Sequence, residues 1–288
     1  MSKKQIRAVA LAFKPQKPEA KLMAQRVISL CRSQKITVYS APEQPRLQGI
    51  EDWIEKSKAR KVDLVIALGG DGTYLRAARY LNGTEVPVLG IHMGFLGFLT
   101  PARHEDLERL LNLAFQGKLP VLKRALLEVQ FQSKSSSIKC LALNDVVLER
   151  GGNGRLMNLS IHSGKDFVTR LKADGLIVST PTGSTAYNLA ASGPIIHPGV
   201  AALVVTPICP HSLTTRPLVL CDEHSLMLEV ESPTQTSSLV IDGYEAGHFS
   251  AGDRIVIRRS KKSHHMLVPP TYSYFETLRE KLRFGERD

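Results

Sequence analysis

The pattern of hydrophobic and polar positions divides the chain into two parts of different character. In the first part, short apolar runs alternate with segments whose apolar residues recur at helical spacing. The runs predict strands over residues 7–13, 36–40, 62–68 and 86–91, and the helical spacing predicts helices over residues 19–33, near Trp53, from Tyr74 to Arg79, and over residues 105–115. This alternation predicts a doubly wound, Rossmann-like α/β domain.

Beyond residue 101, short runs separated by Gly, Ser, Asn and Pro replace the helical periodicity. Such a pattern predicts an all-β, sandwich-like domain, with strands over residues 126–131, 138–149, 156–162, 167–171, 176–180, 225–231, 238–242 and 253–259. Helical spacing returns from Tyr272 to Leu282, behind a Ser273-x-x-Glu276 capping box. We therefore expect an α/β domain over residues 1–100, a β-rich domain over residues 101–268, and a C-terminal helix over residues 269–288 that returns to the first domain.

The predicted strand over residues 62–68 leads into a glycine-rich turn, Gly69-Gly70-Asp71-Gly72-Thr73. Glycines let a ligand approach main-chain N–H groups, and the helix that follows directs its unpaired N–H groups and positive dipole end to the same place. This combination is typical of a phosphate-binding loop. Because phosphates repel a carboxylate, Asp71 fits either a bridging metal ion or a base for the hydroxyl being phosphorylated. Alternatively, Asp71 caps the helix.

A second polar segment, from Thr180 to Asn188, is rich in hydroxyl groups. Its side chains suit the hydroxyls and base edges of a nucleotide, and Tyr187 suits stacking on adenine; a Ser/Thr-rich hairpin loop or a helix cap explains it as well. Asn144-Asp145 interrupts an apolar run, which fits either a ribose-binding carboxylate or a bulge at a sheet edge. Arg155 follows a glycine-rich loop and is free to reach a phosphate or solvent.

Composition narrows the range of functions. The chain has 288 residues, of which 43% are hydrophobic and 23% charged, and it contains no apolar run of the roughly 18 residues that a transmembrane helix needs. We expect no membrane partner and a cytoplasmic location. A formal charge of +11 favours anionic ligands, but the basic residues near 258–262 lack interleaved aromatics, so we expect phosphorylated small molecules and no nucleic acid. The four cysteines lack paired spacing and are expected to be reduced core thiols, and no metal ligands are assigned.

Together these segments resemble the NAD kinase family. The resemblance runs nearly from end to end through the glycine-rich turn, Leu96-Gly97-Phe98-Leu99-Thr100, Asn144-Asp145-Val146-Val147, Asp174-Gly175-Leu176, Thr180 through Tyr187, and Tyr274-Phe275-Glu276-Thr277-Leu278. Phosphofructokinases and diacylglycerol-type lipid kinases share the first motif, which therefore indicates the reaction type and not the substrate. The segment ending at Tyr187 is highly specific.

The resemblance implies ATP-dependent transfer of the γ-phosphoryl group to the 2′-hydroxyl of the adenosine ribose of NAD, giving NADP. It also implies a divalent metal ion, for which we expect Mg²⁺, and a homo-oligomer, either dimer or tetramer. By the family pattern Asp71 is the catalytic base, and the ATP-phosphate loop comprises Gly69, Gly70, Gly72 and Thr73. The residues implied to hold NAD are Asp71, Gly72, Arg76, Asn144, Asp145, Arg155, Lys172, Asp174, Thr185, Ala186, Tyr187, Asn188, Leu189, Ala190 and Tyr244.

The sequence departs from this pattern at His92, where many relatives carry Asn, and at Tyr244, where others carry His or Gln. Two other functions fit part of the pattern. A lipid or sugar kinase would share the glycine-rich turn but not the segment from Thr180 to Asn188. A non-catalytic sensor would bind NADP without forming a metal-dependent product.

Overall fold

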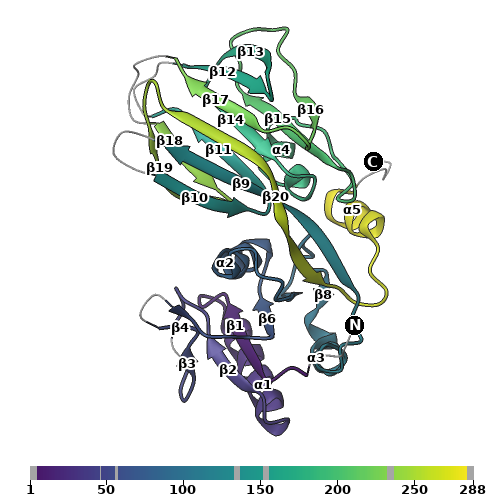
Figure 1. Cartoon of the computed structure of the whole chain (residues 1–288). Coiled ribbons are helices and arrows are strands. Elements are labelled where there is room, and N and C mark those ends of the chain that lie inside the picture. Colours follow the sequence, from purple (N-terminus) through teal and green to yellow (C-terminus); the bar gives the residue numbers. More distant parts are fainter. Residues whose placement is uncertain are drawn as a thin grey trace. The chain divides into compact units, whose positions relative to one another are not determined.

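The chain forms two compact units in the computed structural model, which describes residues 5–45, 47–55, 58–132, 137–151, 156–231 and 237–283 (Figure 1). The first unit combines Met1–Lys123 with His264–Asp288, and the second unit is Arg124–Ser263. The expected division of the chain into functional domains, with limits at residues 100 and 268, stays a prediction.

The first unit contains a parallel sheet whose central strands are buried on both faces. Its order is β3-β2-β1-β6-β7, with β8 beside the end of β7, and the last residues of β20 also pair with β7. The strands are β1 (Ala8–Phe13), β2 (Thr37–Ser40), β3 (Glu51–Asp52), β6 (Leu64–Leu68), β7 (Val88–His92), β8 (Ala102–Arg103) and β20 (Arg254–Leu267). Every residue of β6 and β7 is buried, as expected of a parallel sheet covered by helices. The predicted doubly wound α/β class is confirmed.

The helices of the first unit are α1 (Pro18–Ser33), α2 (Asp71–Leu81), the short 3-10 helix η1 (His104–Asp106), α3 (Leu107–Phe115) and α5 (Tyr274–Leu282). The apolar faces of α1 and α3 join the core of the sheet, and α2 packs on β6, β1 and β7. The Ser273 hydroxyl accepts the N–H of Glu276, which confirms the predicted cap of α5. This helix belongs to the first unit, where Glu280 pairs with Arg103, so the C-terminal helix does return to it.

The helix expected near Trp53 is wrong. Trp53 lies between β3 and a small hairpin of β4 (Ile54–Glu55) and β5 (Lys58–Ala59). Its main-chain N–H donates to the Ser40 carbonyl, which extends the edge of the sheet, and its buried indole donates to the Arg60 carbonyl. These partners, distant in sequence, outweigh a helical preference that extends over only a few residues.

The second unit is an antiparallel sandwich. One sheet has the order β16-β15-β14-β11-β18-β19, and the other contains β13, β12, β17, β20, β9 and β10. The strands not yet bounded are β9 (Val121–Gln132), β10 (Ser137–Ala142), β11 (Asp145–Glu149), β12 (Met157–Ser163), β13 (Asp166–Ala173), β14 (Gly175–Ser179), β15 (Ala202–Ile208), β16 (Leu218–Cys221), β17 (Leu226–Val230), β18 (Ser237–Ile241) and β19 (Tyr244–Phe249). Residues of both sheets share one apolar core, so the predicted all-β class is confirmed.

Three differences from the expected strands affect the candidate site. The run over residues 138–149 is two strands, β10 and β11, that meet at a turn containing Asn144. Strands β15, β16 and β19 were not anticipated. The segment after β14 forms two short helices, η2 (Thr182–Thr185) and α4 (Tyr187–Ala190). Within the part of the chain that the structure describes, no helix is long and apolar enough to cross a membrane.

Candidate functional site

The glycine-rich turn joins β6 to α2 in the first unit, as the sequence predicted. Gly69 has a φ of +155°, and a Cβ atom added there would lie 2.5 Å from the Thr73 hydroxyl, so only glycine fits. Gly70 is the N-cap of α2, and a Cβ at Gly70 or Gly72 would meet no atom within 4 Å. The turn therefore leaves open space beside the N-terminus of α2, where unpaired N–H groups attract anions.

Asp71 is the first residue of α2 rather than its cap, since the helix begins three residues before the expected Tyr74. Its carboxylate accepts hydrogen bonds from a second turn: the N–H of Phe98 donates to Oδ2 at 3.0 Å and the N–H of Leu99 to Oδ1 at 3.0 Å. The Thr100 hydroxyl also donates to Oδ1, at 3.2 Å. A carboxylate offers about four acceptor positions, so Oδ2 keeps capacity for one more donor.

The turn that holds Asp71 needs glycine at position 97. A Cβ atom there would lie 2.1 Å from Oδ1 of Asp71 and 2.3 Å from the Thr100 hydroxyl. The motif Leu96-Gly97-Phe98-Leu99-Thr100 therefore matters because it orients a carboxylate that comes from another part of the chain.

His92 ends β7 just before this turn, and its side chain is buried. Its Nδ1 lies 2.9 Å from the Gly94 carbonyl oxygen, whereas Nε2 is buried without a partner. Burial lowers the pKa of the His92 imidazole, against the smaller opposing effect of the Gly94 carbonyl. We infer a neutral ring that donates from Nδ1 to Gly94.

Arg76 lies one turn after Asp71 on α2 and is tied to main-chain carbonyls. Its Nη2 donates to the Phe13 carbonyl at 2.8 Å and its Nη1 to the Glu43 carbonyl at 3.4 Å. These bonds hold the guanidinium beside the end of β1 and the loop that follows β2. The Nε atom of Arg76 is buried without a partner.

In the second unit, one carboxylate organises the turn between β10 and β11. Asp242 accepts the N–H groups of Leu143, Asn144 and Asp145, with N···O distances of 2.8, 2.7 and 3.1 Å. Asp242 lies in the Asp242-Gly243 turn between β18 and β19, where both residues have positive φ. Sequence reasoning used this dipeptide only to locate Tyr244. An Asp-Gly dipeptide predicts a turn, but it does not predict that the Asp242 carboxylate binds N–H groups about one hundred residues away.

Asn144 and Asp145 are both buried in this turn, with 7% and 5% of their surface exposed. Burial, and secondarily the charge of Asp242, raise the pKa of Asp145 from 3.8 to about 7. The Asn144 Oδ1 atom has no hydrogen-bond partner, and neither has the buried Thr182 hydroxyl. Buried polar groups are normally paired, so these two atoms require a partner from water or from a ligand.

The segment from Thr180 to Asn188 packs directly on this turn. The Thr180 N–H donates to the Asn144 carbonyl at 2.8 Å, and the Thr180 hydroxyl donates to the Leu143 carbonyl at 2.6 Å. A Cβ atom at Gly183 would lie 2.1 Å from the Asn144 carbonyl oxygen. The structure therefore brings together two motifs that are about 40 residues apart in the sequence.

The side chain of Asn188 fixes the C-terminal end of this segment by hydrogen bonds. Its Nδ2 donates to the Ser184 carbonyl at 3.0 Å and the Pro194 carbonyl at 3.1 Å, and its Oδ1 accepts the Thr206 hydroxyl at 2.6 Å. The side chain is wholly buried, so it positions the segment. The other predicted residues here are at least partly exposed: Thr185, Ala186, Tyr187, Leu189 and Ala190.

Tyr187 presents an exposed ring beside the Asn144-Asp145 turn. Its exposed fraction is 41%. Partial burial raises the pKa of its hydroxyl, and the acidic groups of Glu149, Cys209 and Asp145 add to this effect. The ring is therefore available for stacking close to Asp145.

The remaining predicted residues of the second unit lie on other strands. Asp174 follows β13 and its Oδ1 is 2.6 Å from Nε of Arg150, whereas Lys172 on the same strand is exposed. Tyr244 begins β19 and is exposed. Arg155 lies outside the described residues.

The cysteines only partly follow expectation. All four are free thiols, and Cys31 is buried, but Cys209 and Cys221 are exposed, so core placement is wrong for these two. Cys209 directly follows β15, and Cys221 is the last residue of β16.

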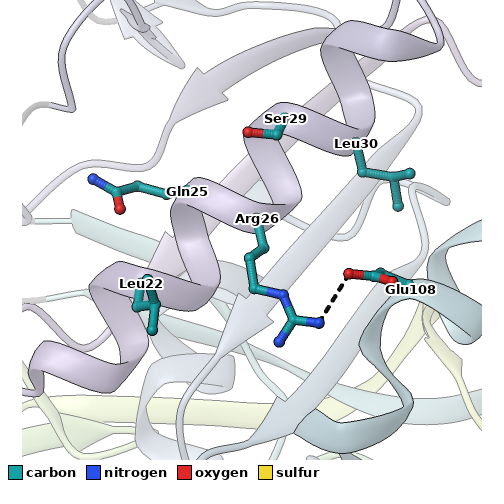
Figure 2. A pocket seen from close by; sticks show the side chains of 6 residues that line it. All are labelled: Leu22, Gln25, Arg26, Ser29, Leu30 and Glu108. Atoms are coloured by element: carbon teal, nitrogen blue, oxygen red, sulfur yellow. Dashed lines mark hydrogen bonds and ion pairs between the residues drawn. The ribbon is translucent and has the colours of Figure 1, made fainter.

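Two pockets in the first unit contain none of the predicted site residues. The first, of about 320 Å³, lies between α1 and α3 (Figure 2), where Nη2 of Arg26 pairs with Oε1 of Glu108 at 2.8 Å. The second, of about 380 Å³, is mostly apolar and is lined by residues that include Leu64, Pro87 and Leu119. Neither contains Asp71, so neither is the candidate site.

Comparisons with known proteins cover both units. The model of the ATP-NAD kinase N-terminal domain matches residues 9–119, and that of the ATP-NAD kinase C-terminal domain matches residues 143–268. Among curated relatives, the NAD kinase of Bdellovibrio bacteriovorus is 39% identical over 98% of this chain and 93% of its own length. The NAD kinase of Syntrophotalea carbinolica is 38% identical over 98% of this chain and 100% of its own length.

Solved structures agree. Yeast NADH kinase complexed with NADH superposes with a TM-score of 0.90 at 27% identity, covering 99% of this chain and 89% of the yeast chain. An NAD kinase from Archaeoglobus fulgidus in complex with ATP has the same fold, with a TM-score of 0.76 at 24% identity, covering 96% of this chain and 98% of that chain. The chain therefore belongs to the NAD kinase family.

Proposed function

We propose that the chain transfers the γ-phosphoryl group of ATP to the 2′-hydroxyl of the adenosine ribose of NAD, with Asp71 as the general base. Family membership supports the reaction and its two substrates. The observation that carries the role of Asp71 is its carboxylate at the N-terminus of α2, oriented by three donors and with one acceptor position of Oδ2 left over. A ribose hydroxyl is the donor that would complete this set.

In the proposed reaction, the 2′-oxygen of NAD attacks the γ-phosphorus and its proton passes to Oδ2 of Asp71. The bond between the γ-phosphorus and the β,γ-bridging oxygen breaks, and ADP leaves. Such transfers have loose transition states, so alignment and neutralisation of charge matter more than the strength of the base. The open space beside Gly70 and Gly72 supports a phosphate position at the N-terminus of α2. Gly69 and Thr73 hold the shape of that turn.

The proposed NAD contacts of the second unit centre on the turn between β10 and β11. Asn144 Oδ1 and the Thr182 hydroxyl are buried polar atoms without partners, and the hydroxyls of a ribose would supply them. The exposed ring of Tyr187 is the proposed stacking surface for adenine. The other contacts implied by the family pattern remain part of the proposal: Gly72, Arg76, Arg155, Lys172, Asp174, the residues from Thr185 to Ala190, and Tyr244.

A divalent metal ion, proposed to be Mg²⁺, would neutralise charge on the transferred phosphates. Among the described residues, no group of three or more His, Cys, Asp or Glu could hold a metal ion, so these side chains do not fit a site made by the protein alone. Mg²⁺ is commonly held by substrate phosphates with one or two carboxylates, and we propose that it enters with ATP.

We also propose a homo-oligomer in the cytoplasm. Leu218 and Val219 of β16 are exposed at the edge of a sheet, and the unpaired N–H and C=O groups of an exposed apolar edge strand are a template for pairing with another chain. Four free cysteines fit a reducing compartment.

The test is conversion of NAD to NADP in the presence of ATP and Mg²⁺, detected with a dehydrogenase specific for NADP. Replacing a general base should lower kcat by about 10²–10⁴-fold, so we expect such a loss for Asp71→Asn with little change in NAD affinity. Asp166→Asn, at an exposed aspartate of the second unit, is the matched control and should retain full activity. A near-normal kcat for Asp71→Asn would refute the base assignment, and absence of NADP with the wild-type chain would refute the function.

A further inference from the structure

We propose that Asp145 binds the dinucleotide as a neutral carboxylic acid rather than as a carboxylate, so that the affinity for NAD falls as the pH is raised through neutrality. This inference rests on the proposed function, because it concerns NAD bound at the turn between β10 and β11. It goes further by assigning a proton to the binding site.

The position of Asp145 disfavours a negative charge. It begins β11, a central strand between β14 and β18, and pairs with Ser179 of β14. Only 5% of its surface is exposed. Burial of a carboxyl group in the middle of a sheet removes the water that would stabilise its ionised form.

The charged groups around Asp145 act in the same direction. Asp242, from the turn after β18, has its carboxylate within hydrogen-bonding distance of the Asp145 N–H, at 3.1 Å. Tyr187, from α4, also interacts electrostatically with Asp145. Both neighbours are acids, and the charge of Asp242 opposes a second negative charge on Asp145.

Of the two carboxyls, Asp242 is the one built to carry the charge. Three main-chain N–H groups donate to it, and such donors stabilise a carboxylate. The charge of Asp242 adds to the cost of ionising Asp145, which is the more deeply buried of the two, so the proton resides on Asp145. The raised pKa of Asp145, about 7, agrees with this assignment, with burial as the larger cause and Asp242 as the smaller.

A neutral carboxyl has a chemical advantage at this place. It both donates and accepts a hydrogen bond, whereas a carboxylate only accepts. The neighbouring bare atoms, Asn144 Oδ1 and the Thr182 hydroxyl oxygen, can already accept from ribose hydroxyls. A protonated Asp145 adds a donor for an acceptor atom of the nucleotide and removes a negative charge that would repel its phosphates. Bound NAD also covers the remaining exposed surface of Asp145, which favours the neutral form further.

The direct test measures NAD binding by titration calorimetry with the full chain, without ATP, between about pH 6 and pH 8.5. If only the protonated form binds well, the dissociation constant should rise above neutrality, approaching tenfold per pH unit. Asn also donates and accepts and has nearly the shape of the neutral acid. Asp145→Asn should therefore bind NAD with a dissociation constant that no longer depends on pH in this range. Asp166→Asn should follow the wild-type curve.

A second measurement needs no variant. At about pH 8, binding of NAD by the wild-type chain should take up a fraction of a proton, visible as a binding enthalpy that depends on the ionisation enthalpy of the buffer. Equal NAD affinity of the wild type at both ends of the pH range, or no proton uptake, would overturn the proposal. So would an Asp145→Asn variant that keeps the wild-type pH dependence.

These binding experiments are independent of turnover. If NAD binds with the expected pH dependence and no NADP forms, the proposed function fails while the neutral acid stands. If NADP forms and the dissociation constant for NAD does not depend on pH, the proposed function stands and the neutral acid is refuted. No detectable NAD binding at any pH would overturn both.

Discussion

Replacing Gly97 by Ala tests whether the reaction depends on the orientation of Asp71. The added Cβ atom would lie 2.1 Å from Oδ1 of Asp71 and 2.3 Å from the Thr100 hydroxyl, whereas ordinary contacts begin at 3.4 Å. The carboxylate must therefore move by about 1 Å, since its other neighbours, the N–H groups of Phe98 and Leu99, belong to the same turn. The substitution displaces the proposed base without removing it.

The substitution is expected to lower both the rate of the reaction and the stability of the fold. A misplacement of about 1 Å in a reacting group can lower the rate by about 10²-fold, and we expect this loss in kcat. Weakening one or two hydrogen bonds costs about 0.5–1.5 kcal/mol each in the free energy of unfolding. NAD affinity should change less than kcat, because most of the proposed NAD contacts belong to the second unit.

The assay measures kcat at saturating ATP, Mg²⁺ and NAD, together with urea unfolding of the same preparation. Gly94→Ala is the control: Gly94 lies in the same turn with a φ of +131°, but an added Cβ meets no atom within 4 Å. It introduces backbone strain without contacting Asp71 and should reduce stability more than kcat. A folded Gly97→Ala variant with kcat within about threefold of the wild type would show that the orientation of Asp71 does not limit the reaction.

Two further predictions concern stability. Because the pKa of Asp145 is raised from 3.8 to about 7 in the folded state, the folded chain holds an extra proton in that window, and its free energy of unfolding should fall as the pH rises, by up to about 4 kcal/mol. Urea unfolding at several pH values should show this slope in the wild type but not in Asp145→Asn; equal slopes would contradict it. Asn188→Ala removes three buried hydrogen bonds and should cost about 2–4 kcal/mol, and a loss below about 0.5 kcal/mol in urea would show that Asn188 does not fasten its segment.

Much of the first unit could be predicted because its strands are buried on both faces. Continuous apolar runs identify β1, β6 and β7 in the sequence, and the amphipathic spacing of α1 predicted its extent to within one residue. These are local signals. The helix expected near Trp53 failed because its local preference was weak and the bond to the Ser40 carbonyl is not local.

Some strands of the second unit were harder to predict, because pairing with a neighbouring strand and not their own composition makes them strands. Strand β19 contains Gly, His and Glu, and it exists because it pairs with β18. The apolar run over residues 138–149 reads as one strand, but the carboxylate of Asp242 bends it at Asn144 by binding three consecutive N–H groups. No pattern within that run encodes a partner almost one hundred residues away.

The candidate site shows the same limit in two of its three Asp-Gly dipeptides. Asp71-Gly72 and Asp242-Gly243 are alike as sequence, and both carboxylates bind N–H groups of a distant turn. They differ in what surrounds them. Asp71 follows a buried parallel strand and begins a helix, which places it beside an anion-binding N-terminus, whereas both residues of Asp242-Gly243 have positive φ, as the tight turn between two antiparallel strands requires. The dipeptide therefore predicts a turn, and only the elements on either side of it indicate whether its carboxylate takes part in chemistry or in folding.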